Sequence, residues 1–300
     1  MPFRFKIIHI LSSTYLLSLT SACTQQQVHS PEKPKNLLLN SSQTKAPSIP
    51  SSIEAPAQQK QLSRNQVITQ KKTKVVLPVK LHKISHNDIQ FNIVTFDDRT
   101  QSLTVVDQPN GPGSLYSNSQ AAAKPSNGIA AINAGFFTPE GKPLGLVITN
   151  TKKRGSYNTS SLGSGMYYLT KEGAKISRRS IWNTLSKTPP TELLQSGPML
   201  IERSKTVAGL SNKEARVRSF IATDGNNHWC IGHAGSCTLK ELSNALQSLK
   251  IDNFKLQTAL NLDGGRSSDL WVASTVTNGP IHIRPFWNKD VRNFLVLKNK

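Results

Sequence analysis

A long segment near the N-terminus of this chain cannot form a packed core. Residues 24–74 are rich in Gln, Ser, Pro, Lys and Asn, contain no aromatic residue, and show no apolar recurrence at a period of 2 or 3.6. Such a composition buries too little apolar surface to offset the entropy lost on ordering. We therefore predict a disordered tether over residues 23–78. The remaining residues, 79–300, are numerous enough for one sizeable core and are expected to form a single domain.

The first 22 residues predict export. Arg4 and Lys6 precede an apolar run over residues 7–19, which is too short to cross a bilayer as a helix. Small residues follow the run and end at Cys23, a pattern that resembles a lipobox, in which this cysteine is diacylated and becomes the mature N-terminus. An ordinary secretory signal cleaved nearby is the alternative. We expect the protein to be held at a bacterial membrane through lipidated Cys23, in the cell envelope and facing the periplasm or the exterior.

The chain is strongly basic, with a formal net charge of +20. The tether contributes part of this excess, since it carries eight basic residues against two acidic ones. A positive balance suits anionic surfaces of the cell envelope or a substrate that bears phosphate. No nucleic-acid recognition motif accompanies the charge, so a nucleic-acid partner is not expected.

Short strand patterns separated by turns dominate the rest of the sequence. They predict strands at 89–96, 103–106, 129–133, 144–149, 165–170, 199–202, 217–223, 228–232, 259–262 and 294–297. The first two are expected to pair as a hairpin across residues 97–99. A second hairpin is expected across the Asp-Gly-Asn-Asn sequence at 224–227.

Few helices are predicted beside these strands. Thr238 and Glu241 fit a capping box, and leucines follow at helical spacing up to Leu249. Residues 119–124 predict a shorter helix, and residues 194–198 are expected to form a loop of small polar residues. Many strands, few helices and no βαβ repetition indicate an α+β fold, a mixed and mostly antiparallel sheet with a few packed helices.

Two cysteines remain in the predicted domain, Cys230 and Cys237. In an oxidising compartment we expect them to form a disulfide across a short loop, with two free thiols as the alternative.

The stretch that carries most chemical information is Leu-Asn-Leu-Asp-Gly-Gly-Arg-Ser-Ser-Asp at 260–269. A buried strand is expected to deliver Asp263 to its end. The successive amides of Gly264 and Gly265 can converge into a nest that favours anions. A cation and two hydroxyls follow, Arg266, Ser267 and Ser268. An ordinary Asp-Gly-Gly turn between strands is the alternative.

Four further segments accompany this stretch in a fixed order. They are Ile-Asn-Ala-Gly-Phe-Phe at 132–137, Gly-Leu-Val-Ile at 145–148, Gln-Ser-Gly-Pro-Met-Leu at 195–200 and Arg-Ser at 218–219. Together with Asn-Leu-Asp-Gly-Gly at 261–265, they resemble the phosphodiester glycosidase family over residues 91–297. Arg266 departs from the pattern, because that family more commonly has a third glycine there.

The resemblance implies hydrolysis of the bond between the anomeric carbon of a sugar and a phosphodiester oxygen. Glycoside hydrolysis usually employs two carboxyl groups. The resemblance makes Asp263 the first candidate for nucleophile or base, and Glu140 the preferred second carboxylate. Glu202, Asp224 and Asp269 are the alternatives to Glu140.

A phosphate leaving group needs positive charge more than it needs a proton. Arg218, Arg266 and the amides of Gly264 and Gly265 are therefore expected to stabilise it. The remaining substrate-binding candidates are polar side chains expected to orient sugar hydroxyls or bind the substrate: Asn133, Gln195, Ser196, Ser267 and Ser268.

The expected function is that of an exported glycosidase acting on sugar-1-phosphodiester linkages in cell-envelope or exopolysaccharide-type glycans. The alternative is a non-catalytic binder of phosphorylated glycans or peptidoglycan on the same fold. No cofactor is required by the sequence, and the seven histidines show no metal-ligand spacing. A divalent cation beside Asp263 stays open, because carboxylate and carbonyl sites leave weak traces in a sequence.

Overall fold

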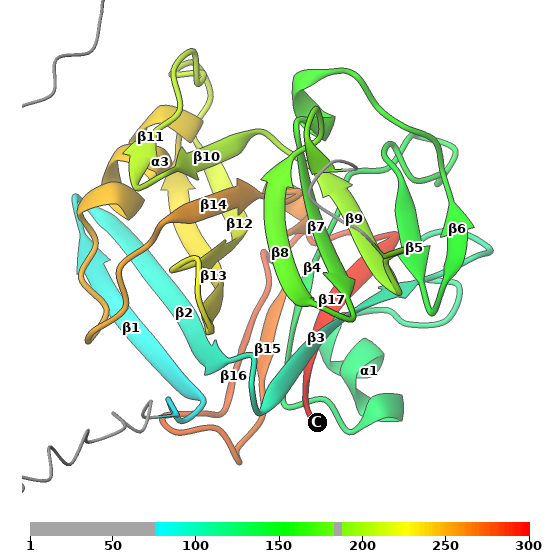
Figure 1. Ribbon diagram of the computed structural model, residues 1–300, viewed down its shortest axis with the longest axis horizontal. Coiled ribbons are helices and arrows are strands. Elements are labelled where there is room, and N and C mark those ends of the chain that lie inside the picture. The colour runs from blue at the N-terminus through cyan, green and yellow to red at the C-terminus, as the bar shows by residue number, and fades with distance from the viewer. Residues whose placement is uncertain (1–75, 183–187) are drawn as a thin grey trace, which may run out of the picture. The chain divides into compact units, whose positions relative to one another are not determined.

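The structure is a computed structural model that describes residues 76–182 and 188–300. The predicted signal peptide, Cys23 and residues 23–75 of the predicted tether lie outside the described residues. The described part consists mostly of antiparallel sheets with few helices, as the sequence predicts (Figure 1).

The largest sheet has seven strands, and every neighbouring pair in it is antiparallel. In spatial order the strands are β1 (Lys80–His86), β2 (Ile89–Asp97), β13 (His228–Cys237), β12 (Arg216–Thr223), β14 (Thr258–Asn261), β10 (Met199–Glu202) and β11 (Lys205–Thr206). The predicted hairpin across 224–227 is confirmed, since β12 pairs with β13.

Two five-stranded sheets complete the fold. The first contains β16 (Ile281–Ile283), β15 (Leu270–Val272), β4 (Ala130–Asn133), β17 (Asn293–Asn299) and β3 (Gln101–Asp107). The second contains β6 (Lys152–Arg154), β5 (Val147–Thr149), β9 (Glu192–Ser196), β7 (Gly165–Thr170) and β8 (Gly173–Arg178).

The helices cover outer faces of these sheets. α3 (Leu239–Ser248) packs on the seven-stranded sheet, and α1 (Ser119–Ala123) packs on β4 and β17. The short turns η1 (Lys124–Ser126), η2 (Ser161–Gly163) and η3 (Gly265–Ser267) are 3₁₀-helical. The capping box is confirmed, because the Glu241 amide donates to the Thr238 hydroxyl at 3.2 Å and the Thr238 amide donates to Glu241 Oε2 at 2.9 Å. No helix in the described part of the chain is long and apolar enough to cross a bilayer.

One apolar core joins the inner faces of all three sheets. Its members include Ile231 from the seven-stranded sheet, Leu295 from the first five-stranded sheet and Leu194 from the second. Tyr167 packs edge-on against Trp229 with ring centroids 5.9 Å apart, and its buried hydroxyl donates to the Leu103 carbonyl at 2.6 Å. These two contacts bind β7 to β13 and to β3.

The first predicted hairpin is wrong, although both of its strands exist. β2 pairs with β1 on one edge and with β13 on the other, whereas β3 pairs with β17 in another sheet. A strand has only two edges for pairing. Both edges of β2 are occupied, so the turn at 98–100 passes the chain from one sheet to the next.

The expected loop at residues 194–198 is also wrong in its first half. Leu194, Gln195 and Ser196 belong to β9, the central strand of its sheet, and all three are buried. A strand covered on both faces need not alternate apolar and polar residues. The sequence pattern therefore gave no sign of it.

The predicted disulfide does not form. Cys230 and Cys237 are free and buried, and both lie on the single strand β13. Seven residues of extended strand separate two Cα atoms by about 23 Å, far beyond the reach of a disulfide. The expected short loop between them is continuous strand. Burial raises the pKa of both thiols, that of Cys237 to about 11.

Candidate functional site

Asp263 lies where the seven-stranded sheet meets the first five-stranded sheet. It follows β14 by two residues, and its amide donates to the Ala134 carbonyl at 2.9 Å. The Asn133 side-chain Nδ2 donates to the Asp263 carbonyl at 2.6 Å. Asn133 and Ala134 stand at the end of β4, so the ends of two strands from different sheets hold Asp263 between them.

The Asn133 side chain is fully buried and its oxygen is occupied as well. Oδ1 accepts from the Ser219 hydroxyl at 2.6 Å and from the Asp269 amide at 3.1 Å. A buried amide is costly unless its polar atoms are paired. The structure therefore places Asn133 as a positioning residue that fixes the Asp263 backbone, not as a group aimed at a sugar.

The two glycines after Asp263 are required by the backbone. A Cβ on Gly264 would stand 2.7 Å from the Val217 carbonyl oxygen, and Gly265 has φ +59°. The Gly264 amide donates to Asp263 Oδ1 at 2.8 Å. This amide therefore orients the carboxylate of its own neighbour instead of standing free for a bound anion.

Burial raises the pKa of the Asp263 carboxyl above its ordinary value. The Ser267 hydroxyl, the Gly264 amide and the charges of Lys289 and Arg216 act in the opposite direction without cancelling the rise. The Ser267 hydroxyl is buried and has no hydrogen bond of ordinary geometry. A carboxylate with a raised pKa holds a proton more readily than an exposed one, which suits a general base.

The cations beside Asp263 are not all the predicted ones. Arg216 and Lys289 are exposed, and the positive charge of each attracts the Asp263 carboxylate and lowers its pKa. Arg218 is buried, and its guanidinium donates to the carbonyls of Cys237 at 3.0 Å and Glu214 at 2.8 Å. Burial lowers the pKa of Arg218. Its donors satisfy the backbone. Arg216 pairs with the exposed Glu214 carboxylate at 2.6 Å but remains exposed, and Lys289 forms no ion pair with a described residue, so these two cations are better placed to meet a phosphate.

The other residues of the predicted anion nest surround Asp263 on its C-terminal side. Arg266 is exposed, and its Nε donates to the Trp287 carbonyl at 3.0 Å. Ser268 is buried, and its hydroxyl lies 3.4 Å from the Val217 carbonyl. Of these side chains, only Arg266 is directed to the surface.

Glu140 is not brought to Asp263. It is fully exposed on a turn after β4, where the Thr138 hydroxyl lowers the pKa of its carboxyl. No contact between Glu140 and Asp263 occurs among the residues described.

The three alternative carboxylates are committed elsewhere. Glu202 pairs with Arg178, and Asp224 accepts from the amide of His228 at 3.2 Å. Asp269 is buried, accepts from the Ser119 amide at 2.8 Å, and lies 2.9 Å from His282 Nε2. Asn133 contacts both Asp263 and Asp269, but through their backbones.

The side chains of Gln195 and Ser196 hold neighbouring backbone segments in place. In the Gln195 side chain, Oε1 accepts from the backbone amides of Leu146 and Asn158. Nε2 donates to the carbonyls of Asn158 and Gly163, and all four distances are within 3.0 Å. The Ser196 hydroxyl donates to the Asn261 carbonyl at 2.9 Å. Both side chains are buried with these partners and do not reach toward a substrate.

The sequence predicts no site role for three residues near the site: Arg216, Lys289 and His233. Arg216 shares a strand with Arg218, two residues away, so strand alternation could have indicated it. His233 lies opposite Ser219 in the pairing of β12 with β13, and burial lowers its pKa to about 4. No motif surrounds Lys289, which enters the site through the loop that follows β16.

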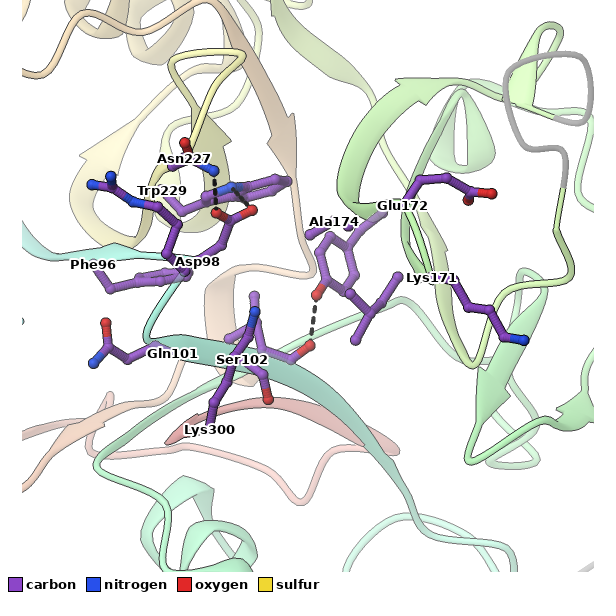
Figure 2. A pocket seen from close by; sticks show the side chains of 15 residues that line it. Phe96, Asp98, Gln101, Ser102, Lys171, Glu172, Ala174, Asn227, Trp229 and Lys300 are labelled. Atoms are coloured by element: carbon purple, nitrogen blue, oxygen red, sulfur yellow. Dashed lines mark hydrogen bonds between the residues drawn. The ribbon is translucent and has the colours of Figure 1, made fainter. Parts of the chain in front are cut away.

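A cavity of about 260 Å³ lies away from Asp263, between the β2–β3 turn and the β7–β8 hairpin (Figure 2). Asp98 accepts from Asn227 Nδ2 at 2.9 Å and from Trp229 Nε1 at 3.2 Å. Dashed lines mark both hydrogen bonds in Figure 2. Glu172 accepts from the Thr170 hydroxyl, which lowers the pKa of Glu172. Both carboxylates of this cavity are thus held by donors. This cavity therefore offers no free carboxylate for catalysis, and Asp263 remains the centre of the candidate site.

Within residues 76–182 and 188–300, no group of three or more His, Cys, Asp or Glu side chains is arranged to hold a metal ion.

The family model described as phosphodiester glycosidase matches residues 126–298, which include Asn133, Arg218 and Asp263. No curated protein sequence matches the chain. Among solved structures, the catalytic domain of zebrafish N-acetylglucosamine-1-phosphodiester alpha-N-acetylglucosaminidase, auto-inhibited by its pro-peptide, is similar at 16% identity and a TM-score of 0.54, over 77% of this chain and 85% of that one.

Two bacterial structures are similar at lower scores. A hypothetical protein from Synechocystis has 16% identity and a TM-score of 0.49, over 73% of this chain and 61% of that one. A putative exported protein from Burkholderia pseudomallei has 11% identity and a TM-score of 0.43, over 70% and 74%.

Proposed function

Because this chain belongs to the phosphodiester glycosidase family, we propose that it hydrolyses the bond between a sugar's anomeric carbon and a phosphodiester oxygen. One observation carries the proposal most directly. Asp263 is held at the ends of two strands, its pKa is raised by burial, and two exposed cations, Arg216 and Lys289, act on it.

In the proposed reaction, Asp263 acts as a general base. It removes a proton from water while the oxygen of that water bonds to the anomeric carbon. The bond from this carbon to the phosphodiester oxygen breaks, and the electron pair leaves with the phosphate. Arg216 and Lys289 stabilise the negative charge that develops there. A phosphate leaves as an anion without a proton donor, so this route requires no second carboxylate in contact with Asp263, and none is found there among the residues that the structure describes.

We also propose that the protein acts in the cell envelope as a lipid-anchored enzyme. The proposal rests on the basic and apolar residues before Cys23 and on the basic residues of the tether. Expression in bacteria fed labelled palmitate tests it. Label in the wild-type chain and its loss in Cys23→Ser is the expected result, and equal labelling of both would contradict it.

The activity is tested with uridine-diphosphate N-acetylglucosamine, whose sugar is linked through an anomeric phosphate. We expect release of free sugar by the wild-type chain and release about 10²–10⁴-fold slower by Asp263→Asn. Equal release by the two proteins would remove Asp263 from the reaction.

A second candidate function is a non-catalytic binder of phosphorylated glycans. It is favoured by the engagement of Glu202, Asp224 and Asp269 with other partners and by Arg266 in place of a glycine. Under this candidate, both proteins bind the nucleotide sugar and neither releases free sugar.

A further inference from the structure

Two large aromatic side chains stand exposed next to one another in the loop between β16 and β17. Phe286 is 101% exposed and Trp287 is 65% exposed, the highest values among the large hydrophobic residues described. Single exposed apolar residues are common and require no explanation. Two consecutive aromatic rings in water form a patch of the kind that marks a binding surface.

The loop that carries these rings is firmly attached to the Asp263 loop. The Lys289 amide donates to the Arg266 carbonyl at 3.0 Å, and Arg266 Nε donates to the Trp287 carbonyl at 3.0 Å. Asn288 Nδ2 donates to the Ser268 carbonyl at 2.9 Å. Since these bonds fix the loop from Trp287 to Lys289, the exposure of the Trp287 ring is a property of the folded loop.

Two cations, Arg266 and Lys289, lie between the exposed rings and Asp263 in the hydrogen-bonded loops. Neither Arg266 nor Lys289 forms an ion pair with any described residue. Lys289 Nζ lies 4.6 Å from the centroid of the Phe137 ring and acts on the Asp263 carboxylate. A surface of exposed rings and unpaired cations is complementary to a chain that alternates sugars and phosphates. The C–H face of a pyranose packs on an aromatic ring, and phosphates attract the cations.

We propose that the loop over residues 284–289 is a glycan-binding subsite for an anionic, phosphodiester-linked polysaccharide, with Trp287 stacking on a sugar next to the one cleaved. This inference rests on the proposed function and narrows the substrate to a polymer. The cleaved linkage lies at Asp263, and Arg266 and Lys289 contact the phosphates on either side of it. The position of Trp287 one hydrogen bond from Arg266 makes the subsite continuous with the Asp263 site.

Binding tests the subsite without requiring turnover. The full chain and its variants are run through native gels containing poly(N-acetylglucosamine 1-phosphate), and affinity for uridine-diphosphate N-acetylglucosamine is measured by calorimetry. For Trp287→Ala, the ratio of polymer affinity to nucleotide-sugar affinity is expected to fall about tenfold, the worth of one good stacking contact. Trp287→Phe keeps a ring and is expected to restore most of the ratio. Tyr157→Ala is the matched control, because Tyr157 is 47% exposed and its hydroxyl contacts Arg179, outside this loop.

Three outcomes would overturn the subsite. An unchanged ratio in Trp287→Ala, or an equal fall in Tyr157→Ala, would do so. So would Trp287-dependent binding to vesicles of phosphatidylcholine and phosphatidylglycerol without Trp287-dependent binding to the polymer, since the loop would then be a membrane contact. Polymer binding that depends on Trp287 while no sugar is released supports the subsite and contradicts the proposed hydrolysis, so the two failures are distinguishable.

Discussion

The side-chain amide of Asn133 joins Asp263 to Ser219. It donates to the Asp263 carbonyl at 2.6 Å and accepts from the Ser219 hydroxyl at 2.6 Å. Through this one buried side chain, β4 of one sheet sets the position of a loop that leaves β14 of another. The position of the candidate base thus depends on the junction between two sheets.

Replacing Asn133 with Ala is expected to lower both stability and activity. The change leaves the buried Ser219 hydroxyl and the Asp269 amide without their acceptor, at a cost of about 1–3 kcal/mol in the free energy of unfolding. Urea denaturation measures this cost. Ser219→Ala is the control, because it removes only one of the three bonds. A loss in Ser219→Ala as large as in Asn133→Ala would contradict the assigned role.

Asp263→Asn is expected to remove activity and to stabilise the fold. Removing a general base costs about 10²–10⁴-fold in turnover. The raised pKa of Asp263 means that its charged form is unfavourable in the folded state, so the neutral amide should raise the free energy of unfolding at pH 7. Thermal denaturation of both proteins gives the sign. A lower melting temperature for Asp263→Asn would show that its carboxylate is stabilised where it stands.

The sequence predicts Asp263 and the strands beside it because their signals are local. A buried apolar run before Asp-Gly-Gly, and a capping box at Thr238, depend on residues close together in the chain. The cations of the site depend on distance in space. Lys289 reaches Asp263 only because its loop bonds to Arg266, and no periodicity encodes that bond. The sequence predicts that Arg218 stabilises a leaving phosphate, because it stands in the Arg-Ser pair that resembles the family, whereas the fold buries its guanidinium against carbonyls.

Arg218 and Lys289 are expected to differ in what their loss affects. Lys289→Gln should lower kcat/KM for a sugar phosphodiester about 5–10-fold, with kcat reduced because the developing charge loses a cation and KM raised because the bound phosphodiester loses the same cation. The melting temperature should change little. Arg218→Gln should instead lower the free energy of unfolding by about 1–3 kcal/mol, because two carbonyls lose their donor. Steady-state kinetics and urea denaturation on both variants separate the two roles. A kcat/KM effect confined to Arg218→Gln would reverse the assignment.

Reducing agent is expected to leave the folded domain unchanged. Cys230 and Cys237 are free thiols on one strand, and burial raises the pKa of both, which keeps them in the unreactive thiol form. Melting temperatures with and without dithiothreitol should agree, and thiol titration under denaturing conditions should recover both groups. A drop in melting temperature on reduction would mean that the two cysteines are bonded.

The stability of the domain is expected to fall as the pH drops from about 6.5 to 4. Burial lowers the pKa of His233 to about 4, so His233 stays neutral in the folded state while the unfolded chain takes up a proton below pH 6.5. The stability that His233 contributes is therefore complete above pH 6.5 and is lost by about 3 kcal/mol on the way to its folded pKa. Burial also lowers the pKa of His82, which adds to the loss. The raised pKa of Asp263 has the opposite effect, because its protonation stabilises the folded state as the pH falls. The His233→Gln variant is therefore best made in an Asp263→Asn background and compared with Asp263→Asn alone. Urea denaturation at pH 7 and pH 5 should show a smaller pH dependence in the double variant, and an equal dependence would mean that His233 is protonated in the folded protein.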